Sequence, residues 1–244
     1  MNPIQSASAL GQQIWLDAIS RQLLQSGELA RMIEQDGIAG VTSNPAIFEQ
    51  AIAKDPAYSV AKAKLPPSLS NPEMRFEALA LPDIQAACDA FMPMYSASKG
   101  RKGFVSFEVS PSLSHDVAGT VAAAKRLWAA INRPNAMIKI PATLAGLEAV
   151  RQSIAAGINV NVTLMFSPKH VQAVAQAHAA GLADRLAAGQ SIAHIRSVAS
   201  VFISRVDTRL DPLLPENLQG KIAIAAAKVA YDDWQKNWVM PPIS

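Results

Sequence analysis

The chain has 244 residues, of which half are hydrophobic and 17% are charged, with a formal net charge of +3 and a single cysteine. This composition supports a sizeable core and excludes a disordered chain and any intrachain disulfide. The mild basic excess has no interleaved aromatic stripe, so no nucleic-acid partner is expected. The start, "MNPIQSASALGQQIW", lacks the basic and apolar segments of a signal peptide, and no apolar run is long enough to span a membrane. We therefore expect a cytoplasmic protein without a membrane partner.

Short apolar runs alternate with longer amphipathic patterns along the chain. The runs are QIWLDAIS, GIAGVTSNP, GFVSFEVSP, AMIKIPAT, INVNVTLMF and VASVFISRVD. Helical spacing covers residues 114–131, 144–157, 167–189 and 215–238, with Ser114, Thr143 and Ser167 at N-cap positions and Gly157 and Gly189 at C-terminal caps. Alternation of strands and helices predicts right-handed crossovers and a parallel sheet.

The sheet is predicted to be of the barrel type. An open dinucleotide-binding sheet normally has a glycine-rich turn after its first strand, and "DAISRQLLQSGEL" contains none. Polar residues instead stand at or beyond the C-terminal ends of successive strands. In a (β/α)8 barrel, catalytic groups are assembled from these strand ends. The stretch 53–99 interrupts the alternation, so we interpret it as an excursion and a helix between the second and third strands.

Lys139 lies in "NAMIKIPAT", a run that otherwise has the pattern of a buried strand. A lysine is rarely buried without a partner, because its ammonium loses hydration. One interpretation is structural: the side chain pairs with a carboxylate, or its stem is buried and its charged end reaches water. The other is a nucleophilic amine, since burial favours the neutral form that attacks a carbonyl to give a Schiff base.

Two acids lie on earlier strands of the predicted sheet, Asp17 at the end of the first and Glu108 one strand before that of Lys139. Asp17 in "WLDAIS" is a candidate for the proton transfers that Schiff-base chemistry needs, although a helix N-terminal carboxylate is an equally simple interpretation. Glu108 in "FVSFEVSP" is a second acid on an apolar strand. Two acids and one amine on three strands of one sheet favour a catalytic interpretation. The four histidines show no metal-ligand spacing, so no metal site is expected.

The motifs "GVTSNPAIF", "FVSFEVSP", "AMIKIPAT", "GINVNVTLMFS" and "SVASVFISRVD" resemble transaldolase, in the branch found in many bacteria and plants. The resemblance runs from about residue 10 to residue 235. It implies a class I aldolase type of (β/α)8 barrel that uses no metal or organic cofactor. The implied activity moves a dihydroxyacetone unit from a ketose phosphate, sedoheptulose 7-phosphate or fructose 6-phosphate, to an aldose phosphate, glyceraldehyde 3-phosphate or erythrose 4-phosphate, in the pentose phosphate pathway.

The resemblance implies four catalytic residues. Lys139 matches the Schiff-base lysine and Asp17 the principal general acid and base. Glu108 matches the carboxylate that helps to activate the catalytic water, and Thr163 matches the residue that holds this water.

Five further residues match the substrate-binding positions of the family. Asn44 and Asn161 match asparagines that bind substrate hydroxyls. Ser200 and Arg205 match the residues that bind the substrate phosphate, and Phe202 lines the pocket between them. The chemistry of the side chains agrees, because the planar guanidinium of Arg205 suits bidentate phosphate recognition.

The end of the chain departs from the family pattern. A (β/α)8 barrel needs two strand-helix pairs beyond the six runs, and the final "VMPPIS" does not resemble the family's continuation. We therefore expect residues 1–244 to form a single, C-terminally truncated barrel domain with about six of the eight strand-helix units, which could self-associate through its open edges. Two alternatives to transaldolase stay open: a fructose-6-phosphate type of aldolase, and a catalytically weak or silent truncated barrel.

Overall fold

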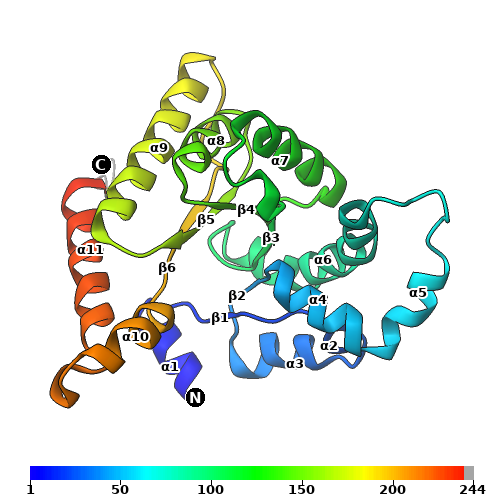
Figure 1. Ribbon diagram of the computed structural model, residues 1–244, viewed down its shortest axis with the longest axis horizontal. Helices are drawn as coiled ribbons and strands as arrows, with labels where there is room; N and C mark the ends of the chain where they lie inside the picture. The colour runs from blue at the N-terminus through cyan, green and yellow to red at the C-terminus, as the bar shows by residue number, and fades with distance from the viewer. Residues whose placement is uncertain (239–244) are drawn as a thin grey trace. The chain divides into compact units, whose positions relative to one another are not determined.

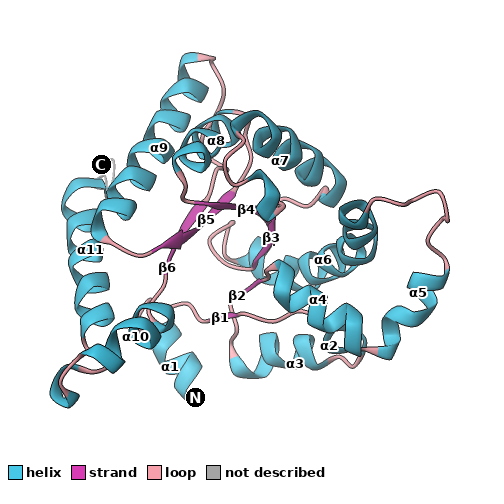
Figure 2. Cartoon of the chain, viewed as in Figure 1, coloured by secondary structure: helices cyan, strands magenta, loops and turns pink. Residues whose placement is uncertain are grey.

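Among residues 1–238, six strands occur where the apolar runs predict them. The computed structural model describes residues 1–238, so the "VMPPIS" segment lies outside the described residues. The strands are β1 (Trp15–Leu16), β2 (Gly40–Thr42), β3 (Phe104–Glu108), β4 (Ala136–Pro141), β5 (Val160–Met165) and β6 (Ser197–Val201). They form one sheet in the order β1-β2-β3-β4-β5-β6, and the pairs β1–β2, β2–β3 and β5–β6 are parallel (Figure 2). The parallel sheet with helical crossovers is therefore confirmed.

Helices separate the strands along the chain (Figure 1). They are α1 (Pro3–Ala9), α2 (Arg21–Gln25), α3 (Glu28–Arg31), α4 (Pro45–Lys54), α5 (Ser59–Ala63), α6 (Pro72–Ala97), α7 (Val117–Ile131), α8 (Leu144–Ala155), α9 (Pro168–Ala187), α10 (Ser204–Leu210) and α11 (Ile222–Trp238). A π-helical turn covers Met32–Asp36, and short 3₁₀ turns cover Pro56–Tyr58, Pro111–Leu113, Asp211–Leu213 and Glu216–Leu218. No helix in the described part of the chain is long and apolar enough to cross a membrane.

The contacts divide the chain into two compact units. The first comprises residues 1–110 and 126–138, and the second comprises residues 111–125 and 139–244. The first unit therefore holds β1 to β3 and α1 to α6, and the second holds β5, β6 and α8 to α11. The boundary passes through α7 and β4.

The core of the first unit contains an aromatic cluster. The rings of Phe48 and Phe107 meet edge to face at a centroid distance of 5.9 Å, and Phe76 stacks on Phe107 at 6.0 Å. The close pairing of β1 with β2 depends on Gly40, because a Cβ there would lie 2.7 Å from the Trp15 ring. The strand pair therefore requires a residue without a side chain at this position.

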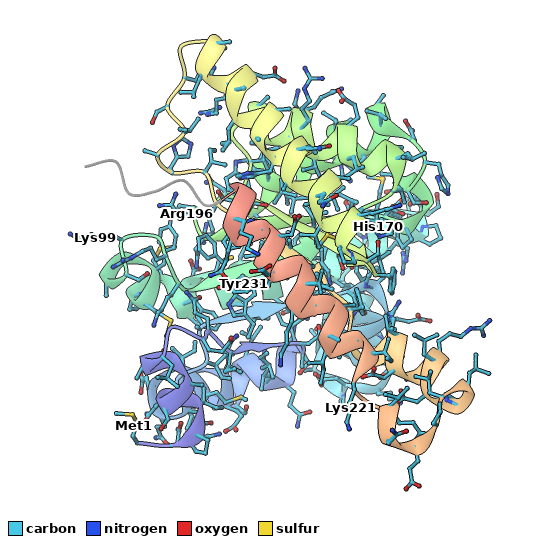
Figure 3. The ribbon with its side chains drawn as sticks, turned by 90° about the vertical axis from the view of Figure 1, so that its left-hand side faces the viewer. Met1, Lys99, His170, Arg196, Lys221 and Tyr231 are labelled. Atoms are coloured by element: carbon cyan, nitrogen blue, oxygen red, sulfur yellow. The ribbon has the colours of Figure 1, made fainter. Side chains whose placement is uncertain are left out.

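In the second unit, α9 packs against α8 on one side and against α11 on another (Figure 1). Gly181, in the middle of α9, permits the first contact, since a Cβ there would lie 2.6 Å from the Arg151 carbonyl oxygen. A glycine within a helix costs about 1 kcal/mol relative to alanine, so this residue is explained by the close approach of α8. Figure 3 shows α11 with Lys221 near its start and Tyr231 further along.

Most predicted helix ends are confirmed. Thr143 accepts a hydrogen bond from the Gly146 N–H, and Ser167 accepts one from the His170 N–H, as N-caps do. Gly157 and Gly189 have φ angles of +91° and +70°, typical of residues that follow a helix C-terminus.

Two predicted helix starts were wrong. The cap of α7 is Asp116 rather than Ser114, because the Asp116 carboxylate accepts from the Gly119 N–H. The pattern 215–238 begins as a helix only at Ile222, after Pro215, a short 3₁₀ turn and Gly220 with φ +68°.

Candidate active site

Lys139 is buried in the fourth strand. All six residues of β4 are buried, and Lys139 itself is 7% exposed. Strand alternation places it on the same face as Met137 and Pro141, while Ile138 and Ile140 face the other way. The sequence prediction of a lysine in a buried, largely apolar strand is therefore met by the structure.

Thr163 lies at an irregularity of β5. Val162 pairs with Ala199 and Met165 with Val201, so β5 contains one more residue than β6 between these two pairs. Leu164 occupies this position with φ +62°, a left-handed conformation that a bulky residue seldom adopts. A bulge redirects the side chains around it and is common near active sites. Thr163 is 2% exposed, and its carbonyl oxygen accepts from the Ala142 N–H just after β4 at 2.8 Å.

Asn161 and Ser200 are joined directly. The Ser200 Oγ donates a hydrogen bond to Asn161 Oδ1 at 2.9 Å. Asn161 is 2% exposed and Ser200 is partly exposed, so the pair leads from the sheet interior toward solvent. The Ser200 hydroxyl therefore occupies an acceptor position of Asn161 Oδ1.

Arg205 lies over an aromatic ring. Its Cζ is 4.6 Å from the centroid of the Phe202 ring, within the range of a cation–π interaction. The side chain of Arg205 is exposed, and no carboxylate forms an ion pair with it among residues 1–238. An exposed guanidinium without a carboxylate partner can bind an anion.

The first unit brings together the other three predicted residues. Asp17 directly follows β1, Asn44 lies two residues after β2, and Glu108 is the last residue of β3. The register pairs Leu16 with Val41 and Thr42 with Ser106, so the three residues lie at the same, C-terminal edge of adjacent strands. A hydrogen bond from Ser43 Oγ to the Ser106 carbonyl at 2.8 Å ties the ends of β2 and β3.

In the Asn44 side chain, the oxygen atom already makes a hydrogen bond within the protein. Its Oδ1 caps α4 by accepting from the Ile47 N–H at 3.0 Å. The Nδ2 group is therefore the part of this side chain that can bind a substrate hydroxyl as a donor. Asp17 is exposed and Glu108 is partly exposed.

Two features of this edge were not predicted from the sequence. Phe166, directly after β5, stacks on Phe202 with ring centroids 5.5 Å apart and an interplanar angle of 23°. Its signal in the sequence is an aromatic residue at the C-terminal end of a strand. The bulge at Leu164 has no comparable signal, because leucine gives no indication of a positive φ. Among residues 1–238, no group of three or more His, Cys, Asp or Glu side chains could hold a metal ion.

The family model described as Transaldolase/Fructose-6-phosphate aldolase matches residues 14–240. The chain is 52% identical to the Transaldolase of Neisseria gonorrhoeae over 241 residues, which cover 99% of this chain and 68% of that protein. It is 45% identical to the Transaldolase of Thiobacillus denitrificans over 248 residues, with coverage of 99% and 69%. It is also 46% identical to the Transaldolase of Trichodesmium erythraeum over 243 residues, with coverage of 93% and 64%.

The chain belongs to the transaldolase/fructose-6-phosphate aldolase family. The family resemblance and the barrel type of fold predicted from the sequence are thereby confirmed.

Proposed function

We propose that this protein is a transaldolase, a transferase of carbohydrate metabolism in the pentose phosphate pathway. It would carry a dihydroxyacetone unit from sedoheptulose 7-phosphate or fructose 6-phosphate to glyceraldehyde 3-phosphate or erythrose 4-phosphate. The observation that carries the proposal is Lys139, 7% exposed within a fully buried strand of a chain that is 52% identical to a Transaldolase.

The proposed reaction begins at the Lys139 amine. Its lone pair attacks the ketose carbonyl carbon, and the resulting carbinolamine loses water to give a protonated Schiff base. The bond between C3 and C4 then breaks. Its electron pair moves into the Schiff base to give an enamine, while the C4 hydroxyl loses its proton and becomes the aldehyde of the departing aldose phosphate.

The second half of the reaction reverses these steps with another aldehyde. The enamine carbon attacks the carbonyl carbon of the acceptor, whose oxygen takes up a proton. Water then adds to the new Schiff base and releases the ketose product, which restores the free amine.

The proton transfers fall to the acids at the ends of β1 and β3. Asp17 would remove the C4 hydroxyl proton and return a proton to the acceptor oxygen. Glu108 would assist the release of water as the Schiff base forms and activate the water that later hydrolyses it, and Thr163, held at the β5 bulge, would position this water. The positions of both acids at the C-terminal ends of β1 and β3 support these roles, because catalytic groups in this type of fold lie at that edge of the sheet.

Two groups of residues would bind the substrate: two asparagines would bind its hydroxyls, and residues at the end of β6 would bind its phosphate. The Nδ2 group of Asn44 would donate to a sugar hydroxyl, because its Oδ1 atom already accepts a hydrogen bond from the Ile47 N–H. Asn161 would bind a second sugar hydroxyl. Arg205 and Ser200 would bind the phosphate, with Phe202 lining the pocket between them. A charge-assisted contact with Arg205 is the strongest of these interactions.

The experiment that tests this function compares two assays with labelled fructose 6-phosphate. With erythrose 4-phosphate as acceptor, a transaldolase produces labelled sedoheptulose 7-phosphate, and without acceptor it releases little dihydroxyacetone. A plain aldolase releases dihydroxyacetone in both assays, and a silent barrel produces nothing in either. The first pattern supports the proposal, and the other two overturn it.

Two further properties are also proposed, the location of the protein in the cell and its self-association. We propose that the protein works in the cytoplasm, where its sugar phosphate substrates would be formed and consumed, without nucleic-acid or membrane partners. Cell fractionation with an antibody to the chain would test this location. We also propose self-association, which is supported by the apolar residues exposed on α11.

A further inference from the structure

Two aromatic rings and a guanidinium form a row at the C-terminal ends of β5 and β6. Phe166 follows the last residue of β5, and Phe202 follows the last residue of β6. The backbone holds these positions together, because the Phe202 N–H donates to the Met165 carbonyl at 2.9 Å. The two rings are stacked at 5.5 Å, and Arg205 lies over the Phe202 ring at 4.6 Å.

Phe166 is a large apolar residue with 41% of its surface exposed. Its backbone N–H donates to His170 Nδ1, in the first turn of α9, at an N···N distance of 3.4 Å, which ties the Phe166 backbone to this helix. Figure 3 labels this histidine at the start of α9. Exposed apolar surface is costly to keep in water, and a ring buried to this extent contributes little to the core. Its contact with Phe202 is therefore its most evident interaction.

The Arg205 guanidinium packs on the Phe202 ring of this row. The guanidinium has no carboxylate partner among the described residues, so the Phe202 ring is the recorded contact that restrains it. An unrestrained arginine loses much rotamer freedom when it binds a ligand, whereas a restrained one loses less. Phe202 is itself only partly buried, and Phe166 covers one face of its ring.

We propose that Phe166 is a positioning residue for the substrate phosphate. It holds the Phe202 ring by stacking, and the ring in turn holds the Arg205 guanidinium in the orientation that binds the phosphate. This inference rests on the proposed function, because it takes the phosphate of a sugar phosphate as the ligand of Arg205. Phe166 would act through Phe202 and Arg205, without touching the phosphate or the reacting carbonyl group itself.

The test compares Phe166→Leu with Phe166→Tyr, which keeps a ring able to stack. Leu186→Ala is the matched control, because Leu186 is a 56% exposed apolar residue of the same unit, at the other end of α9. The first measurement is the affinity of each variant for fructose 6-phosphate and for fructose, by calorimetry. It requires no catalysis, so it is independent of whether the protein transfers a dihydroxyacetone unit. The second is kcat and KM for transfer from both donors.

Phe166→Leu should weaken fructose 6-phosphate binding by about 3-fold or more and raise KM by the same factor, with kcat and fructose binding unchanged. Phe166→Tyr and Leu186→Ala should resemble the wild type. In an Arg205→Ala background, Phe166→Leu should have no further effect on fructose 6-phosphate binding.

Three results would overturn the inference: unchanged affinity in Phe166→Leu, equal losses for fructose and its phosphate, or a full additional loss in the Arg205→Ala background. A wild type that binds fructose 6-phosphate no more tightly than fructose would overturn it as well. A wild type that binds the phosphate but transfers nothing would overturn the proposed function alone, while the binding series still decides the role of Phe166.

Discussion

Ser200 donates a hydrogen bond to Asn161 across 2.9 Å, from β6 to its neighbour β5. The resemblance to transaldolase implies different partners for the two side chains, the substrate phosphate for Ser200 and a sugar hydroxyl for Asn161. The hydrogen bond makes these two expected roles interdependent, because Asn161 Oδ1 is already occupied. A substitution at one position should therefore change the behaviour of the other.

A double-mutant cycle on Ser200 and Asn161 should show this coupling. Ser200→Ala leaves the buried Asn161 Oδ1 without its recorded donor, at a cost of about 1 kcal/mol in the free energy of unfolding. Asn161→Ala should cost about 1–3 kcal/mol, and the double variant should cost less than the sum by roughly 0.5 kcal/mol or more. Urea unfolding gives the free energy of unfolding of the wild type, the two single variants and the double variant. Strict additivity would show that the contact contributes nothing.

A buried polar network in the first unit should contribute more to stability. Asp83 accepts from Arg21 Nε at 3.0 Å and from the Tyr58 hydroxyl at 2.7 Å, and the Arg21 N–H donates to the Tyr58 oxygen at 3.2 Å. The Arg21 guanidinium also lies 4.4 Å from the Tyr58 ring centroid. Side-chain exposure is 13% for Arg21 and 6% for Asp83, so water cannot readily replace a missing partner.

Asp83→Ala should therefore lower the free energy of unfolding by about 3–5 kcal/mol, because it leaves the Arg21 charge buried without its partner. Tyr58→Phe, which removes the hydrogen bonds of the Tyr58 hydroxyl with Asp83 and with the Arg21 backbone N–H, should cost about 1–3 kcal/mol. The matched control is Asp89→Ala, which breaks the exposed ion pair with Arg133 and should change stability little. Equal effects of Asp83→Ala and Asp89→Ala would contradict this account of the network.

Cys88 should be unreactive in the folded protein. Burial raises the pKa of its thiol to about 12, and the neighbouring Asp89 carboxylate adds to the increase. Only about one molecule in ten thousand would then carry the reactive thiolate at pH 8. A thiol reagent should modify the native protein very slowly at pH 8 and the urea-unfolded protein completely.

The same pKa shift predicts a loss of stability at high pH. The folded pKa lies above the unfolded value of 9.0, so the thiol's contribution is fully present below pH 9 and is lost as the pH rises toward 12. Cys88→Ala should show a weaker decline of the unfolding free energy over this range. Rapid labelling of native protein at pH 8, or the same alkaline decline in Cys88→Ala, would refute the assignment.

Local chemistry explains which parts of the fold could be predicted from the sequence. Thr143, Ser167 and the glycines that end α8 and α9 act through contacts within a few residues, so their types alone reveal their roles. Ser114 was wrongly predicted as the N-cap of α7, because Asp116, two residues later, also has a side-chain oxygen that can accept from a backbone N–H. The helix begins after the later of the two residues, Asp116.

Long-range contacts limited the prediction of the site. Lys139 and Glu108 stood out because a charge on an apolar strand is rare in any fold. Phe166 could not be assigned a role, since its stacking on Phe202 joins residues from two strands and depends on their register. The bulge at Leu164 likewise arises from pairing with β6 rather than from the residue itself.

The chain should self-associate through the exposed face of α11. Ile224 and Tyr231, which are seven residues apart and therefore on one face of this helix, are 46% and 58% exposed, and Tyr231 also stacks on Trp234. A depression lined by Ile203, Ile224, Ala227, Lys228 and Tyr231 borders the same face. Sedimentation velocity should show mass increasing with concentration in the wild type and less so in Tyr231→Lys. A concentration-independent monomer for the wild type would contradict this prediction.

Borohydride trapping on Lys139 tests the central claim most directly. The protein is incubated with fructose 6-phosphate, reduced with borohydride, digested and analysed by mass spectrometry, with Lys139→Met as the matched control of similar length. Our account predicts a substrate-derived adduct on Lys139 in the wild type, and neither adduct nor transfer in a folded Lys139→Met variant. A folded wild type without an adduct, or one whose adduct lies on another lysine and persists in Lys139→Met, would contradict the account.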